Sequence, residues 1–347
     1  MMRGLGAKWW KYGCILAGGL LFGVILAAVL TQRQYLQVWY ATYQLRVATE
    51  LSQKVRAAER LMELHEAGQR MLLNILIAGD ETSRQAVLHA WQSRVEEWSE
   101  EVIQGWLEAA SGVWGEADER GQKALLEMAL TVVRRYGTSK VPACRQIVCL
   151  GLSSVSGSVR REAVRVAQHY GSSLRQHWLD LLKDLEAEVR RAALFTVAAF
   201  EDSSTWITDE ELFHWLHDPD EGVRRICHDA LLSRGRTVLE IDLGRRLTHP
   251  DAHERLKLIA ELRYDDVVVD PEPWLHYLVR DPEAAVRVAA VRAVAELRAQ
   301  RRSSCPFWVE SVVRADPDAL ARRIMRYYQE LPFRMSGGDL RPAVSRP

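Results

Sequence analysis

The chain has 347 residues and a formal net charge of zero, from 46 basic and 46 acidic side chains. Arg3, Lys8 and Lys11 lie in the first eleven positions, so the remainder carries three more acidic than basic residues. Sequence-independent phosphate binding needs a clear basic excess, so this charge balance argues against a nucleic-acid partner.

The cysteines show no spacing typical of a disulfide framework. Cys144 and Cys149 are five residues apart on a predicted helix, too far around and along it to close a bond easily. We therefore expect free, buried thiols. The five are Cys14, Cys144, Cys149, Cys227 and Cys305.

Residues 12–30 form a run of 19 residues without a charge. At about 1.5 Å per residue, a helix of this length just crosses a hydrocarbon layer of about 30 Å. A cleaved signal peptide is the alternative, but the run exceeds the usual ~7–15 residues and no clear cleavage site follows it. The sequence therefore predicts a tail at 1–11 and a transmembrane helix at 12–30.

Charges near this segment predict its orientation. Three basic residues precede it, and only Arg33 follows within fifteen residues. The positive-inside rule then places the N-terminus in the cytoplasm and the long C-terminal part outside it. Gly19, Gly23 and Ala27 would let two such helices pack closely, so a homodimer through this face is one interpretation; the ordinary glycine content of membrane helices is the other.

Residues 31–117 are expected to form a helical stalk or hairpin region. Apolar residues recur in steps of three and four from Leu36 to Met62, which predicts an amphipathic helix over 32–78. It would form a stalk-like coiled coil or fold back on a neighbour. Gly79 and Asp80 predict a break, and a second helix is expected over 81–104.

An internal repeat fills residues 118–331. A pair of a hydrophobic residue and arginine defines six frames, in steps of 30, 34, 31, 32 and 35 residues; arginine is present in all six, and Glu254 replaces the hydrophobic residue in one. The position four residues after the first member of the pair is always apolar. Aspartate stands six residues before the arginine in four frames. The six arginines are Arg160, Arg190, Arg224, Arg255, Arg287 and Arg322.

The turn chemistry explains this spacing. Asp218-Pro219-Asp220 and its counterparts would supply a capping aspartate, a proline at the first helical position and a further acid at the positive helix end. Each frame is thus a helix, a short turn and a second helix, such as 206–217 followed by 221–234. Residues 332–347 contain glycine, proline and serine and are expected to be a disordered tail.

These frames resemble the HEAT-repeat family, including its short HEAT-like repeats. The resemblance implies an all-α fold: a right-handed α-solenoid of helix pairs, preceded here by the transmembrane helix and the stalk. It also implies that the aspartate and arginine six apart form a ladder between neighbouring repeats. Matching residues are Asp184 and Arg190, Asp218 and Arg224, Asp281 and Arg287, and Asp316 and Arg322. Ser154, His249 and Glu254 depart from the pattern.

No catalytic, cofactor-binding or metal-binding site is expected, and we interpret the chain as a scaffold rather than an enzyme. His214, His217, Asp218 and His228 form no closed ligand set. His253-Glu254 resembles the iron-binding pairs of deoxyhypusine hydroxylase, but the other frames lack it. The favoured function is a membrane-tethered scaffold for an unidentified protein or peptide; the alternative is a lyase-like or cofactor-maturation factor built on HEAT-like repeats.

Overall fold

The computed structural model describes residues 33, 35–200, 202–264, 270–300 and 307–330. These residues form helices joined by short turns, and no β-strand occurs among them. They divide into two compact units, one up to Thr196 and one from Val197 onward.

The expected transmembrane helix at 12–30, with Gly19, Gly23 and Ala27, and the expected tail at 332–347 lie outside the described residues. Among the helices that are described, none combines the length and the apolar character needed to cross a bilayer.

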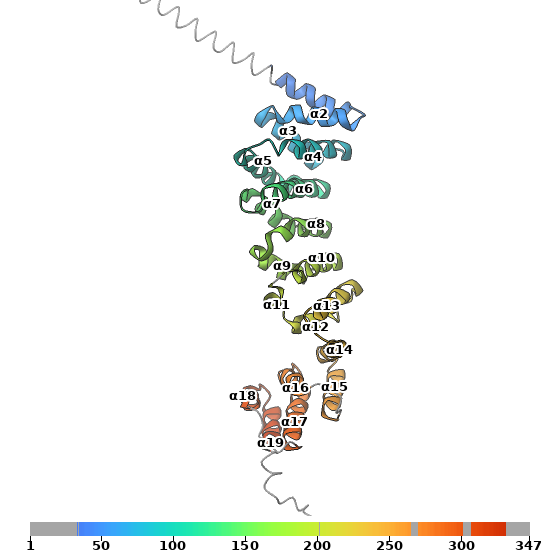
Figure 1. The fold of residues 1–347 in the computed structure, drawn as a ribbon, viewed down its shortest axis with the longest axis vertical. Coiled ribbons are helices and arrows are strands. Elements are labelled where there is room, and N and C mark those ends of the chain that lie inside the picture. The colour runs from blue at the N-terminus through green and yellow to red at the C-terminus, as the bar shows by residue number, and fades with distance from the viewer. Residues whose placement is uncertain (1–32, 34, 201, 265–269, 301–306, 331–347) are drawn as a thin grey trace, which may run out of the picture. The chain divides into compact units, whose positions relative to one another are not determined.

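The first unit consists of two layers of helices (Figure 1). In one layer α2, α4, α6 and α8 pack on one another in succession, and in the other α5 packs on α7 and α7 on α9. Following a helix at 35–47, the elements are α2 (Leu51–Met62), α3 (His65–Ala78), α4 (Glu81–Arg94), α5 (Glu100–Gly112), η1 (Trp114–Glu116), α6 (Glu119–Tyr136), α7 (Pro142–Leu152), α8 (Gly157–Ala167), η2 (Gln168–Leu174), α9 (Arg175–Leu181) and α10 (Ala187–Ala198), which runs into the second unit.

The second unit repeats the helix-pair arrangement. Here α12 packs on α13 and α14, α15 on α17, and α17 on α16 and α19. Among the described residues, α13 and α15 make few direct contacts, although they hold corresponding places in neighbouring pairs. The elements are α11 (Ser203–Trp206), α12 (Asp209–Trp215), α13 (Glu221–Ser233), α14 (Val238–Leu247), α15 (Ala252–Tyr264), α16 (Glu272–Leu278), α17 (Ala284–Gln300), α18 (Phe307–Ala315) and α19 (Ala319–Gln329).

The single helix predicted over 32–78 is wrong, because the chain breaks at 48–50 and again at 63–64. His65 has a positive φ of 48°, so α3 turns back against α2. Gly68 permits this approach: a Cβ there would lie 1.8 Å from the carbonyl oxygen of Leu61. The helix 35–47, α2 and α3 are thus separate packed elements, and the predicted break at Gly79-Asp80 is confirmed.

The helix predicted over 81–104 also ends early, at Arg94. Trp98 turns back so that its ring lies 5.6 Å from those of both Trp91 and Trp106, centroid to centroid. Tyr136 donates a hydrogen bond of 2.8 Å to the carbonyl of Val95. This carbonyl lies at the end of α4 and has no partner within the helix. A tertiary aromatic cluster therefore overrides the continuous helical pattern.

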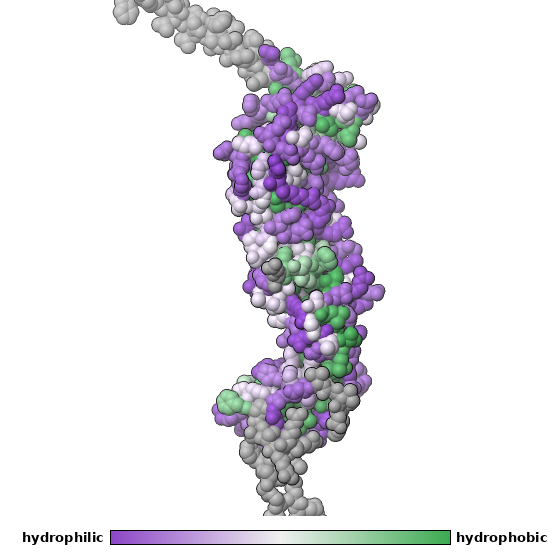
Figure 2. Space-filling view, in the orientation of Figure 1, coloured by the Kyte–Doolittle hydropathy of each residue, from purple (hydrophilic) through white to green (hydrophobic). Residues whose placement is uncertain are grey.

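Buried side chains fill the space between the two layers. The largest fully buried ones in the first unit include Trp91, Trp178, Leu61, Leu76 and Leu125. In the second unit the core joins α14 to α19 through residues such as Leu258, Val286 and Val313. The face of the first unit seen in Figure 2 is mainly hydrophilic over α2 to α8, as this inward burial requires.

Candidate functional site

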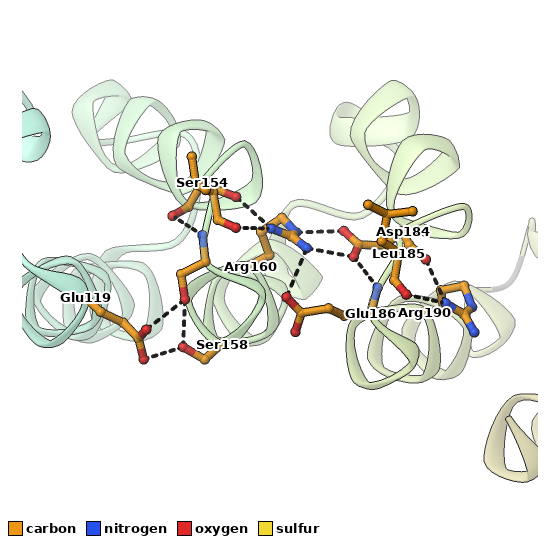
Figure 3. A network of polar contacts seen from close by, with 10 residues as sticks. Glu119, Ser154, Ser158, Arg160, Asp184, Leu185, Glu186 and Arg190 are labelled. Carbon is orange, nitrogen blue, oxygen red and sulfur yellow. Dashed lines mark hydrogen bonds and ion pairs between the residues drawn. The ribbon is translucent and has the colours of Figure 1, made fainter.

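Three arginines of the repeated frames share one geometry. Nη1 of Arg160 donates to the carbonyls of Ser154 and Val155 in its own turn, at 2.8 Å each. Its other edge reaches the next turn, where Nε and Nη2 bind the two carboxylate oxygens of Asp184 at 2.6 and 2.7 Å. Figure 3 shows this bridge between two helix pairs.

Arg255 and Arg287 repeat the bridge in the second unit. Arg255 binds the carbonyls of His249 and Pro250 and both carboxylate oxygens of Asp281. Arg287 binds the carbonyls of Asp281 and Pro282 and the carboxylate of Asp316, at 2.6 and 3.1 Å. All four side chains are buried. We call this series the arginine ladder.

Each ladder aspartate also shapes its own turn. Its Oδ1 accepts a hydrogen bond from the backbone N–H two residues later, as at Asp184 and Asp316, with distances of 2.9 and 2.8 Å. Burial alone would raise the pKa of these two carboxyl groups. The arginine and the backbone N–H outweigh burial, so the pKa of Asp184 and that of Asp316 lie below the usual value.

Within the described part of this ladder, an aspartate and the arginine six residues after it do not pair through the carboxylate. Arg190 and Arg224 bind the carbonyl oxygens of Asp184 and Asp218, at 2.7 Å each, rather than those carboxylates. Arg322 likewise binds the carbonyl of Asp316. The carboxylates of Asp184, Asp281 and Asp316 receive the arginine of the preceding frame, because the long side chain spans the gap between helix pairs.

This geometry makes Arg160 and Arg255 ladder members, which the sequence comparison had set aside because Ser154 and His249 replace aspartate in their own frames. The helix predicted over 221–234 begins at Glu221 as expected, but its capping residue differs from the prediction. Asp220, not Asp218, caps α13, its side chain accepting from the N–H of Val223 at 2.9 Å. Asp318 caps α19 in the same way.

The ladder also continues into residues 51–122, where the repeat was not detected. Lys54 lies 3.5 Å from a carboxylate oxygen of Asp80, and Nη2 of Arg84 binds Asp118 at 2.7 Å. Arg84 also donates to the carbonyls of Leu76 and Ile77. Asp80 stands four residues before Arg84, whereas the repeated frames place aspartate six residues before arginine. This different spacing hid the repeat in the sequence. The stalk or hairpin region is therefore built from packed pairs like those that follow it.

We call each contact between such a cation and the carboxylate of the next turn a rung, and the rung at Arg224 is incomplete. Nη1 of Arg224 binds the carbonyls of Asp218 and Pro219, but in the described chain no carboxylate lies within ion-pair distance of its guanidinium. The next turn carries His249, whose Nδ1 accepts from the N–H of Asp251 at 3.1 Å, as the ladder aspartates do with Oδ1. His249 thus preserves the turn but supplies no anion for Arg224. The incomplete rung at Arg224 coincides with the sparse contact between α13 and α15.

A cleft of about 900 Å³ lies beside this rung in the second unit. Nε2 of His214 is 3.1 Å from the hydroxyl of Tyr277, and the rings of His217 and His249 meet edge to face at 5.3 Å. Burial, together with nearby Arg245 and the other histidines, lowers the pKa of His217, although its hydrogen bond to the Arg245 carbonyl opposes this. Other lining residues are Glu210, Thr248, Asp251, His276 and Arg280.

The remaining candidate groups do not assemble with this cleft. His253 is exposed, and Glu254 pairs with Lys257 at 2.7 Å on its own helix. His228 lies 3.7 Å from Asp229. Within the described ranges, no three histidine, cysteine or acidic side chains are arranged to hold a metal ion.

The thiols within the described residues are free, as predicted. Cys144 and Cys227 are buried, and burial raises the pKa of each to about 12. These thiols stay protonated and unreactive at neutral pH. Cys149 is half-buried, and Cys14 and Cys305 lie outside the described residues.

No protein-family model matches the chain, and no curated protein does so either.

We predict that Arg287→Ala destabilises the chain more than Arg224→Ala. Removing Arg287 leaves the buried Asp316 carboxylate uncompensated, which costs about 3–5 kcal/mol. Removing Arg224 loses hydrogen bonds to two carbonyls and costs about 1 kcal/mol. Thermal unfolding of the purified full chain, followed by circular dichroism, measures both. Equal losses would contradict the assignment of Arg287 and Arg224 to complete and incomplete rungs.

We also predict that His249→Asp raises stability. The new carboxylate would accept from Asp251 and meet the free edge of Arg224, as at the complete rungs, for a gain of about 1 kcal/mol. His249→Ala is the control, because it removes the ring without adding an anion. A melting temperature of His249→Asp at or below that of His249→Ala would refute the proposal that Arg224 lacks only a carboxylate from the next turn.

Stability should fall with acid in two pH windows. Burial lowers the pKa of His169, His217 and His276, so the unfolded chain binds more protons below its own histidine pKa of about 6.5, and stability declines from there. The pKa of the Asp184 and Asp316 carboxyl groups is lowered in the folded chain. Their contribution to the free energy of unfolding is therefore complete above about pH 3.9 and is lost as the pH falls further.

Urea unfolding midpoints across this pH range measure both windows. His217→Gln should reduce the decline between about pH 6.5 and 5 while leaving the aspartate window unchanged. A decline confined to the acidic window in the unmodified chain would contradict the histidine contribution.

Proposed function

We propose that this chain is a membrane-tethered, right-handed α-solenoid of HEAT-type repeats that serves as a scaffold for protein–protein interaction. The main support is the arginine ladder, in which equivalent positions join successive helix pairs in both units. Stacked pairs joined in this way touch mainly their neighbours and present a long surface relative to their volume. Such a surface suits protein or peptide binding.

Exposed apolar side chains indicate where a partner would bind. Val155 and Leu185 occupy equivalent positions, each directly after a ladder residue at a turn, and are 99% and 96% exposed. Phe195 on α10 is also exposed. Large apolar side chains at successive turns have no role in the fold of the first unit, which favours a docking edge there.

The tether rests on the uncharged run at 12–30 and on its flanking charges. Three basic residues before the run and one after it favour a cytoplasmic N-terminus and helix pairs on the opposite side. The helix at 35–47 begins soon after the run and packs its Leu45 against the first unit. The repeats would therefore start close to the membrane.

A second candidate function is a lyase-like or cofactor-maturation activity. The observation in its favour is the histidine-lined cleft, where the Tyr277 hydroxyl lies against His214 and two further histidine rings meet. A scaffold does not need this cleft. Tyr277→Phe and His214→Gln should therefore leave partner binding unchanged if the scaffold function is correct.

We predict that Val155→Asp/Leu185→Asp reduces partner capture about tenfold or more without changing the melting temperature, because a charge in the centre of an apolar contact costs binding energy. The tagged full chain would be cross-linked in native membranes, purified and analysed by quantitative mass spectrometry. Val102→Asp is the matched control, since Val102 is exposed on helix α5 and does not follow a ladder residue. Unchanged capture by the double variant would refute the docking edge.

A further inference from the structure

The helix at 35–47 has one face that nothing in the described chain covers. On its inner side Ala41 and Leu45 are buried, and the Leu45 carbonyl accepts a hydrogen bond of 3.4 Å from Ser83 on α4. On its outer side Trp39 and Tyr43 stack with ring centroids 5.7 Å apart. The exposed large side chains of this face are Tyr35, Leu36, Trp39, Tyr40, Tyr43 and Val47, each at least half exposed.

Most of this outer face lacks charge, although the exposed Arg46 stands between Tyr43 and Val47 in the sequence. From residue 34 to residue 45 the sequence contains no acidic or basic side chain. Exposed faces of the neighbouring helices carry ion pairs instead, such as Glu63 with Arg94 and Glu66 with Arg70. A contiguous aromatic surface without charge is unfavourable in water and marks a contact surface.

A groove of about 430 Å³ borders this face and lies between the helix at 35–47 and α2. Tyr43 and Val47 form its apolar side, and Arg56 and Arg60 line it from α2, one helical turn apart. Arg60 donates to the side-chain oxygen of Gln44 at 3.1 Å. Within the described ranges neither arginine lies within ion-pair distance of a carboxylate, unlike the arginines of complete ladder rungs.

We propose that this face lies in the headgroup layer of an anionic phospholipid bilayer, with a lipid phosphate bound by Arg56 and Arg60. Guanidinium groups bind phosphate oxygens through paired N–H donors, and the groove places apolar side chains beside them for the upper part of the acyl chains. Tryptophan and tyrosine are the side chains that favour this layer.

The choice of a bilayer rests on the proposed tether. The uncharged run ends at Leu30, and four residues separate it from Tyr35. A fully extended chain spans at most about 3.6 Å per residue, so Tyr35 stays within roughly 20 Å of the end of that run. The membrane surface is therefore always within reach of this face, whereas a protein partner would have to be recruited to it.

Photo-crosslinking of the full chain tests this assignment. p-Benzoylphenylalanine would replace Trp39 or Tyr43 on the face, or Val102 on α5 as the exposed control. The chain would be reconstituted into vesicles of phosphatidylcholine alone or of equal parts phosphatidylcholine and phosphatidylglycerol, and adducts identified by mass. We expect lipid adducts at positions 39 and 43, about tenfold above the control, because the aromatic face is held in the interface.

The arginines are tested by Arg56→Gln/Arg60→Gln, with Arg134→Gln/Arg135→Gln on exposed positions of α6 as the matched control. Phosphatidylglycerol should increase the yield at position 43 about fivefold or more in the unmodified chain and in the control, and this increase should disappear in the groove variant. An equal yield in both vesicle types, or an unchanged increase in the groove variant, would overturn the phosphate site.

Alkaline extraction of native membranes that contain the full chain separates this inference from the tether. Release of the unmodified chain would refute the tether itself. A chain that resists extraction, yet gives dimer or protein adducts and no lipid adducts at positions 39 and 43 in native membranes, would refute only the lipid contact and assign the face to a protein partner.

Discussion

The fold depends on an arginine side chain that bonds in two directions. The turn after the first helix of a pair contains backbone carbonyls without helical partners, such as those of Ser154 and Val155. One nitrogen of the arginine satisfies two of them, and the opposite edge of the same guanidinium binds the aspartate of the next turn, as at Arg160 and Arg287. A single planar group thus closes its own turn and sets the spacing to the following pair.

The chemistry of the rungs varies along the chain, and packing varies with it. A lysine begins the series at Lys54, and a neutral hydrogen bond of 3.0 Å between Ser154 and Gln122 takes the place of an ion pair. At His249 the turn is kept but the anion is lost, and α13 and α15 make little contact. Because buried charges need partners, each complete rung enforces one stacking geometry, whereas an incomplete rung allows the pairs to separate.

The same residue type has different roles at different depths. Buried arginines, such as Arg255 and Arg287, each make four hydrogen bonds within the fold. Arg56 and Arg60 are exposed, lie beside an uncharged aromatic face and keep donors available for a ligand. The apolar side chains divide in the same way between the interlayer core and positions such as Val155 and Leu185 at the turns.

The sequence by itself determined the helical class and most of the repeat positions, because helical periodicity, turn prolines and the recurring arginine are local signals. It could not determine which carboxylate each arginine binds, since that depends on the gap between stacked pairs rather than on a spacing of six. The breaks after Met62 and Arg94 were likewise tertiary in origin: the first needs Gly68 to approach Leu61, and the second needs three tryptophan rings to meet. Local pattern fixed what each segment could be, and packing decided where it ended and what it touched.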